Sequence, residues 1–98
     1  MQHAVIKDSI QQTERLSLEP GIITIGTATD NDIVVDDSDV SPYHLKIVTS
    51  FHMTLMIDLS SSTGSYLNGK RVIKHSLKND DHIQLGKHEY IVCGIPKI

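Results

Sequence analysis

Apolar and polar residues alternate with a period of two in residues 44–47, 53–59 and 82–85. Side chains of a β-strand point alternately to its two faces, so each stretch predicts a strand with one buried face. In the middle stretch the apolar positions that alternate with Thr54, Met56 and Asp58 are Met53, Leu55, Ile57 and Leu59.

Further short runs are rich in β-branched or aromatic residues and also predict strands. These runs are residues 4–7, 15–18, 22–25, 33–35 and 89–93. Segments rich in Gly, Pro, Asn, Asp and Ser separate the runs, and no window carries ten residues of helical periodicity. About ten or eleven short strands with turns every roughly 8–12 residues predict an all-β fold, an antiparallel β-sandwich or barrel.

The chain has 98 residues, of which 39% are hydrophobic, and this size fits one domain spanning residues 1–98. Cys93 is the single cysteine, so an internal disulfide is impossible. The N-terminal residues do not resemble a secretion leader, and the apolar runs are too short to cross a bilayer. We therefore expect a cytoplasmic protein without direct membrane insertion, and a monomer.

Charge is distributed unevenly along the chain. Residues 1–40 carry eight acidic and two basic side chains, whereas residues 41–98 carry four acidic and seven basic ones. The second part lacks a basic run, and the chain has no Trp and one Phe with which to stack on bases. Nucleic acid is therefore not expected as a partner.

Residues 64–71 read GSYLNGKR and nearly match the phosphate-binding pattern G-x-x-x-x-G-K-[ST]. That loop requires a helix after the lysine, but Arg71 replaces the hydroxyl residue and Val72-Ile73 does not favour a helix. Asn68-Gly69 instead predicts a β-hairpin with a type I′ turn, because both residues accept positive φ. We interpret the segment as a hairpin and expect no enzymatic activity.

No metal-binding pattern is present among the histidines. The six His residues form no i,i+4 pair and have no accompanying Cys pair. The acidic stretch from Asp30 to Asp39 has Val34 and Val35 where a calcium loop needs a ligand and a glycine. We predict neither a metal nor a cofactor.

Four separated patches, read together, resemble the forkhead-associated (FHA) domain family. They are Ile25-Gly26 with DNDIVV at 30–35, SPYHLKI at 41–47, DLSSSTGSYLNGKRV at 58–72, and DHIQLG at 81–86. The resemblance extends over about residues 20–94. It implies a β-sandwich of eleven strands whose loops at one end bind phosphothreonine peptides.

Several positions that hold the phosphopeptide in this family are changed here. The residue after Gly26, an arginine that grips the phosphate in the family, is Thr27. Ser41 matches the family's phosphate-binding serine, but the next residue is Pro42, which has no donor. The resemblance therefore implies a phosphate site without its main cation.

The turn before the hairpin also differs from the family at positions that contact the bound peptide. Ser61 and Gly64 are kept, Ser62 replaces a threonine, and Thr63 replaces the asparagine that fixes the backbone of the bound peptide in typical members. The resemblance implies that Thr27, Ser41, Pro42, Ser62 and Thr63 face the partner.

A second group of matching residues implies that the loop scaffold is preserved. His44 corresponds to the family histidine that braces the loops from beneath. The residues assigned to this scaffold are Gly26, His44, Ser61, Gly64, Asn68 and Gly69. Our leading hypothesis is a non-catalytic protein-interaction module that binds a protein or peptide through its loop end, with reduced or absent phosphothreonine dependence.

Two alternatives remain open at this stage. In the first alternative, the chain is a phosphothreonine reader in signalling whose contacts are rearranged, with Lys70 or Arg71 supplying the missing charge. In the second alternative, the chain is a scaffold or ring domain of a secretion apparatus.

Overall fold

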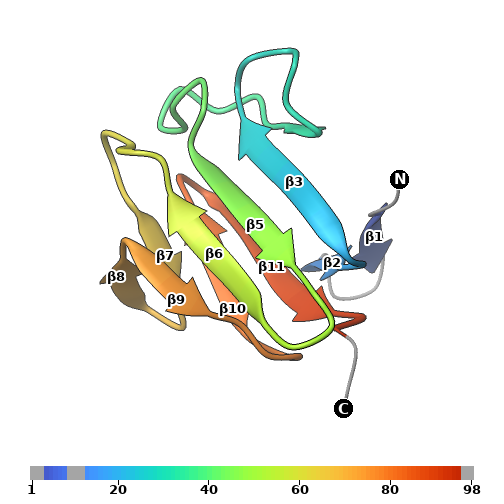
Figure 1. Cartoon of the computed structure of the whole chain (residues 1–98). Helices are drawn as coiled ribbons and strands as arrows, with labels where there is room; N and C mark the ends of the chain where they lie inside the picture. Colours follow the sequence, from blue (N-terminus) through green and yellow to red (C-terminus); the bar gives the residue numbers. More distant parts are fainter. Residues whose placement is uncertain (1–3, 9–12, 96–98) are drawn as a thin grey trace.

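The computed structural model describes residues 4–8 and 13–95, and these form eleven strands in two sheets. The sheets pack face to face as the two layers of a sandwich (Figure 1). The predicted all-β sandwich is therefore confirmed. The described part of the chain contains no helix able to span a bilayer.

One sheet has six strands in the order β1-β2-β11-β10-β7-β8. Its strands are β1 (Ala4–Asp8), β2 (Thr13–Ser17), β7 (Ser65–Leu67), β8 (Lys70–Val72), β10 (His82–Leu85) and β11 (His88–Cys93). All its pairs are antiparallel except β2 with β11, which is parallel.

The other sheet has five strands in the order β4-β3-β5-β6-β9. Its strands are β3 (Gly21–Gly26), β4 (Ile33–Val34), β5 (Leu45–Thr49), β6 (Thr54–Asp58) and β9 (Lys74–Ser76). Here the β3–β4 pair is parallel and the others are antiparallel. The sandwich is thus antiparallel apart from one parallel pair in each sheet.

The core lies between the two sheets and is made almost entirely of aliphatic side chains. Strands β2–β7, β10 and β11 contribute residues on their inner faces, as the period-two pattern predicted for β5 and β10. The largest fully buried apolar side chains are Leu16, Leu18, Ile25, Leu45, Ile47, Met56, Ile83, Leu85 and Val92.

The predicted phase of β6 is wrong. Thr54 and Met56 are buried, whereas Leu55 is only half-buried and Met53 is 56% exposed. Both faces of this strand carry apolar residues, so alternation alone does not determine its phase. The register with β5 determines it, because Met56 pairs with the fully buried Ile47.

The hairpin prediction for residues 64–71 is confirmed. Asn68 and Gly69 have φ values of 50° and 88°, as a type I′ turn requires, and they join β7 to β8. Lys70 begins a strand rather than a helix. The sequence pattern did not predict β9, whose three residues are all exposed and carry no apolar signal.

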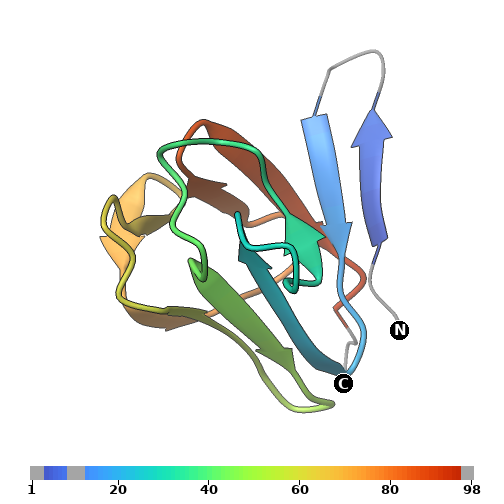
Figure 2. The ribbon, with the colours of Figure 1, turned by 90° about the horizontal axis from the view of Figure 1, so that it is seen from above.

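The loops after β3, before β5 and after β6 meet at one end of the sandwich. Figures 1 and 2 show the first two side by side, and hydrogen bonds between the loops confirm the proximity of all three. This end carries the residues that the sequence singled out for recognition.

Candidate functional site

The loop after β3 lies along the loop before β5. The backbone N–H of Thr27 donates to the carbonyl of Ser41 at 3.1 Å, and that of Ala28 donates to the carbonyl of Pro42 at 3.1 Å. Gly26 allows this approach, because a Cβ at this position would lie 2.1 Å from the Pro42 carbonyl oxygen. The sequence therefore requires glycine here for close contact between two backbones.

Asn31 fixes the same junction from beneath. Its amide nitrogen donates to the carbonyls of Ala28, at 2.8 Å, and of Pro42, at 2.7 Å. The side chain is buried, and its Oδ1 atom has no partner within the described part of the chain. Sequence reasoning placed Asn31 in a family pattern but gave it no role, since a single Asn in an acidic turn carries no signal of its own.

Ser41 and Ser62 come together at the centre of the three loops. The backbone N–H of Ser62 donates to Ser41 Oγ at 3.1 Å, and the two hydroxyl oxygens are 3.4 Å apart. Ser41 is half-buried and Ser62 is exposed. The pair presents two hydroxyl groups, which are able both to donate to and to accept from an incoming polar group.

Thr63 closes the other side of this centre. Its Oγ1 donates to the carbonyl of Asp39 at 2.6 Å, so the hydroxyl links two loops rather than standing free. Thr27 lies half-buried beside Ser41, and Pro42 is exposed. The structure therefore brings together the five residues predicted to face a partner, whose contact with a partner stays a prediction.

His44 connects two of the loops from inside the molecule. It is fully buried, its Nδ1 accepts the backbone N–H of Ser41 at 3.0 Å, and its Nε2 lies 2.8 Å from the carbonyl of Gly64. Since Nδ1 accepts, the proton sits on Nε2 and is donated to Gly64. A neutral imidazole with this tautomer satisfies both backbone groups.

Asp58 organises the turn after β6. Its carboxylate accepts the hydroxyl of Ser61, the hydroxyl of Ser65 at 2.7 Å and the backbone N–H of Ser61 at 3.0 Å. Burial acts to raise the pKa of Asp58, but the hydrogen bonds from Ser61 and Ser65 outweigh it and hold the pKa below its ordinary value of 3.8. Ser61 in turn accepts the backbone N–H of Gly64 at 3.0 Å, so that Asp58 and Ser61 together connect the residues of this turn.

Asp37 joins the loop before β5 to the opposite sheet. Its carboxylate accepts the backbone N–H of Lys87 at 2.9 Å and that of Asp39 at 2.8 Å, and it lies 3.8 Å from His88 Nε2. The bond from Lys87, followed by the bond from Asp39, lowers the pKa of Asp37, while partial burial opposes them. Sequence reasoning gave Asp37 no role, so this connection was missed.

Asn68 acts within the sandwich instead of at the loop centre. Its Oδ1 accepts the backbone N–H of His82 at 2.9 Å, and its Nδ2 donates to Asp81 at 3.0 Å. These bonds attach the β7–β8 hairpin to the start of β10. Asn68 and Gly69 form the turn of this hairpin, and their role as scaffold for the loop end stays a prediction.

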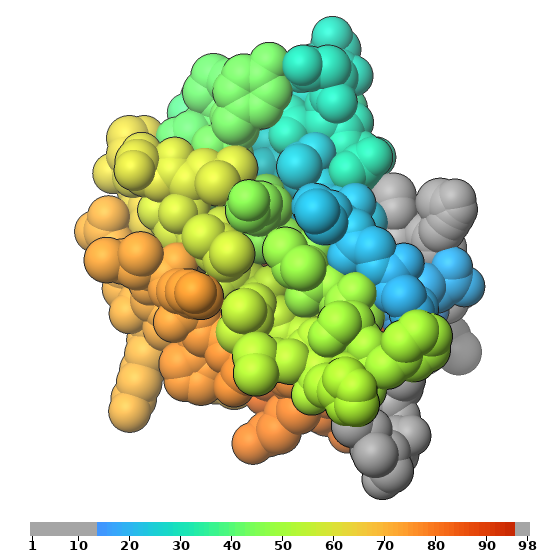
Figure 3. Space-filling model, viewed as in Figure 1, coloured from blue at the N-terminus to red at the C-terminus, as the bar shows by residue number. Residues whose placement is uncertain are grey.

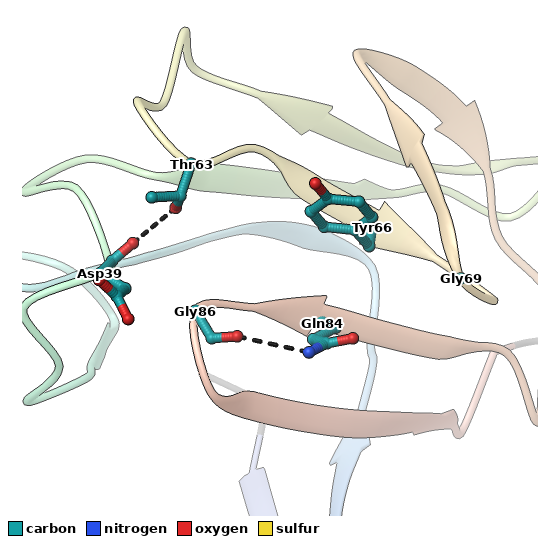
Figure 4. Close-up of a pocket in the computed structure, with 6 residues that line it drawn as sticks. All are labelled: Asp39, Thr63, Tyr66, Gly69, Gln84 and Gly86. Carbon is teal, nitrogen blue, oxygen red and sulfur yellow. Dashed lines mark hydrogen bonds between the residues drawn. The ribbon is translucent and has the colours of Figure 1, made fainter.

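A cavity of about 570 Å³ opens beside Thr63, on the outer side of β7 and β10. Figure 4 shows the Thr63–Asp39 hydrogen bond at one end of it and Tyr66 and Gln84 along its floor. The lining residues are Asp39, Thr63, Tyr66, Gly69, Gln84 and Gly86. It offers one carboxylate, one aromatic ring and one amide next to the loop centre.

Charge at the loop end is negative. Asp30, Asp36 and Asp39 are exposed there, and Asp30 accepts the hydroxyl of Tyr43 at 2.9 Å. Among the described residues, no Lys or Arg side chain forms a hydrogen bond with Thr27, Ser41 or Ser62. In the part of the chain that the structure describes, the groups at the loop centre are therefore hydroxyls and backbone groups that carry no hydrogen bond from a Lys or Arg side chain.

Arg71 packs against the back of the turn after β6. Its Nε lies 2.5 Å from the position that a Cβ on Gly64 would take, and the side chain lines a second cavity with Asp58 and Ser61. Within the part of the chain that the structure describes, no three His, Cys, Asp or Glu residues group as a metal site. His3, one of the six histidines, lies outside that part.

Comparison with known proteins places these features in a family. The model of the FHA domain matches residues 23–86. Glycogen accumulation regulator GarA of Mycobacterium tuberculosis is 30% identical over 93 residues, which are 95% of this chain. The chain spans 57% of the length of GarA.

Two solved structures are similar over most of the chain. Mycobacterium tuberculosis EmbR in complex with a low-affinity phosphopeptide has a TM-score of 0.77 and 30% identity, covering 93% of this chain and 24% of that one. The FhaA FHA domain complexed with the intracellular domain of Rv3910 has a TM-score of 0.72 and 30% identity, covering 90% of this chain and 91% of that one.

Proposed function

Because this chain belongs to the FHA domain family, we propose that it is a non-catalytic module that binds a partner protein across its loop end, with reduced dependence on phosphothreonine. The partner-facing residues in this proposal are Thr27, Ser41, Pro42, Ser62 and Thr63. FHA domains are interaction modules. A peptide or protein partner is therefore the class of ligand to test.

The observation that carries the proposal is the combination of an intact loop frame with missing positive charge. His44, Ser61 and Gly26 hold the three loops together as described above. Thr27 stands where the resemblance implies an arginine. A charge-assisted hydrogen bond contributes about 1.5–3 kcal/mol, so its loss weakens phosphate binding by roughly ten- to hundredfold.

Protein and phosphopeptide ligands are both known among the similar structures. EmbR has been solved with a low-affinity phosphopeptide, and FhaA with the intracellular domain of Rv3910. For this chain, the acidic surroundings of the loop centre favour a ligand that carries basic residues. Within the proposal, the cavity at Asp39 and Gln84 accepts such a side chain over the ring of Tyr66.

The test measures by calorimetry how matched threonine and phosphothreonine peptide libraries bind to the wild-type protein, Thr27→Arg and Ser41→Ala. We expect the wild-type protein to show little preference for phosphate. Thr27→Arg should strengthen binding of phosphothreonine peptides by about tenfold or more, because it adds one charge-assisted bond. Ser41→Ala should weaken peptide binding, since it removes the central hydroxyl and the acceptor of Ser62 N–H.

Thr29→Arg is the matched control for Thr27→Arg. Thr29 lies exposed in the same loop, so this variant adds the same charge without placing it beside Ser41. A micromolar affinity of the wild-type protein that depends on the phosphate would contradict the reduced-dependence proposal. It would support a phosphothreonine reader whose contacts are rearranged.

A further inference from the structure

The outer face of the five-stranded sheet is unusually apolar. Strands with one solvated face ordinarily alternate apolar inward residues with polar outward residues. Here the outward positions include Ile22, which is 61% exposed, and the half-buried Val48, Leu55 and Ile57. The opposite face of the sandwich is more polar, since the outward residues on β10 are His82 and Gln84.

Strand register places these outward residues in two adjacent rows. Ile22, Val48 and Leu55 are directly paired across β3, β5 and β6 and make an apolar row. In the next row, Lys46 and Lys74 flank Ile57 on either side. Paired Cβ atoms lie about 4.5–5.5 Å apart, so each row is a continuous strip of side chains.

The turn between β5 and β6 extends this strip. Ser50 fixes it, because its Oγ accepts the backbone N–H of Met53 at 3.1 Å and of His52 at 3.3 Å and donates to the carbonyl of Met53 at 2.9 Å. Phe51 and Met53 are 67% and 56% exposed on this fixed turn. Aromatic and methionine side chains are enriched at protein interfaces.

We define the β3–β5–β6 face by the residues of the two rows and the turn. These residues are Ile22, Lys46, Val48, Phe51, Met53, Leu55, Ile57 and Lys74. Figure 3 looks onto this side of the molecule, and side chains of β3, β5, β6 and β9 form its continuous surface. An exposed contiguous apolar surface of this kind commonly marks an interaction site.

Charge on the β3–β5–β6 face is opposite to that of the loop end. Lys46 and Lys74 form no ion pair with another described residue, and the face as defined contains no carboxylate. Asp32, beside β3, accepts the backbone N–H of Thr24 at 2.8 Å and its hydroxyl at 3.3 Å. Asp30, Asp36 and Asp39 lie exposed at the loop end.

We propose that the β3–β5–β6 face is a second docking surface, separate from the loop end, for a protein segment that combines apolar side chains with carboxylates. The apolar row and the Phe51–Met53 turn bury the apolar side chains of the segment. Lys46 and Lys74 receive its carboxylates on both sides of Ile57. The acidic loop end repels the same segment, which directs it to this face.

Charge also favours a protein segment over a membrane. Lipid recognition by charge uses clusters of about four to eight Lys or Arg residues. This face offers two lysines, and the chain carries a net charge of −3. An anionic bilayer is therefore repelled by the molecule as a whole.

The experiment selects peptides from a displayed random library on the immobilised full chain. We expect one class of enriched peptides to combine Leu, Ile or Phe with Asp or Glu, distinct from any basic peptides that bind the acidic loop end. Binding of a synthetic enriched peptide is then measured by fluorescence anisotropy. The double variant Lys46→Glu, Lys74→Glu should weaken it by about tenfold, because two attractive charge pairs become repulsive, and Met53→Ser should also weaken it.

Two control variants carry the same chemical changes elsewhere. Lys87→Glu reverses an exposed charge in the turn before β11, and Val34→Ser removes an exposed apolar side chain on β4. Both should leave the affinity within about twofold of wild type. Urea unfolding of each variant checks that the fold is retained.

Three results would overturn the proposal. The first is a selection that enriches no peptide combining apolar and acidic residues, or an enriched peptide of this kind whose binding the face variants leave unchanged. The second is concentration-dependent sedimentation that Met53→Ser abolishes, since a second copy would then occupy the face. The third is binding to vesicles of anionic phospholipid that the lysine reversals abolish.

Discussion

Truncation of His44 tests the central brace of the loop end. His44→Ala leaves the carbonyl of the buried Gly64 without its donor, at a cost of about 1–3 kcal/mol. The backbone N–H of Ser41 is only partly buried and costs about 1 kcal/mol. The emptied volume adds about 2 kcal/mol or more.

The total of about 4–6 kcal/mol is large beside the roughly 5–15 kcal/mol that stabilises a domain of this size. Urea unfolding followed by circular dichroism measures it. His44→Asn keeps an acceptor near the Nδ1 position, and His44→Gln keeps a donor near the Nε2 position. Each should therefore lose less stability than His44→Ala.

The reasoning is refuted by either of two results. One is a loss below about 1 kcal/mol for His44→Ala, which would mean that the two backbone groups find other partners. The other is that His44→Asn and His44→Gln are no more stable than His44→Ala. In that case packing alone, and not the two hydrogen bonds, makes the residue important.

Three further predictions follow from the geometry. Gly26→Ala should destabilise the domain more than Gly69→Ala in urea unfolding, because the new Cβ at position 26 clashes with the Pro42 carbonyl, whereas a Cβ at position 69 has open space and is strained only by the positive φ. Equal losses of stability in the two variants would contradict this. Asp58 has a pKa below 3.8 in the folded protein, so the stability that its carboxylate contributes is complete well above pH 3.8 and is lost as the pH falls through the folded-state pKa. The difference in unfolding free energy between wild type and Asp58→Asn should therefore shrink on acidification, and a constant difference would contradict the hydrogen-bond account. Burial, with a smaller effect of Glu14, raises the pKa of Tyr90 to about 12, so stability should fall between about pH 10 and pH 12, and Tyr90→Phe should remove the highest phase of the tyrosine absorbance titration.

Much of the fold follows from local chemistry that the sequence displays directly. Asn68-Gly69 predicts its hairpin because few residue pairs accept two positive φ values in succession. Alternation predicts β5 and β10 because one face of each is apolar and the other polar. It fails for β6, where both faces are apolar and the pairing with β5 decides which face is buried.

The site was predictable in its members but not in its connections. Ser41, Ser62 and His44 are identified by their places in a family pattern, and the structure brings them together. Asp37 and Asn31 act over long sequence separations, on Lys87 and Pro42 respectively. No local pattern encodes such contacts, although the Asp58–Ser61 spacing is typical of a side-chain-capped turn and signals that contact.

The strands that end the two sheets have a consequence for assembly. β4 has two residues, β8 and β9 have three each, and Lys70, Arg71 and Lys74 lie on the latter two. At these three edges the short strands offer few unpaired amides to a neighbouring molecule and so discourage sheet-to-sheet fusion, whereas the fourth edge strand, β1, has five residues. At these three edges, contacts with a neighbouring domain are left to side chains rather than to shared backbone ladders, and β1 is the edge at which such a ladder is able to form.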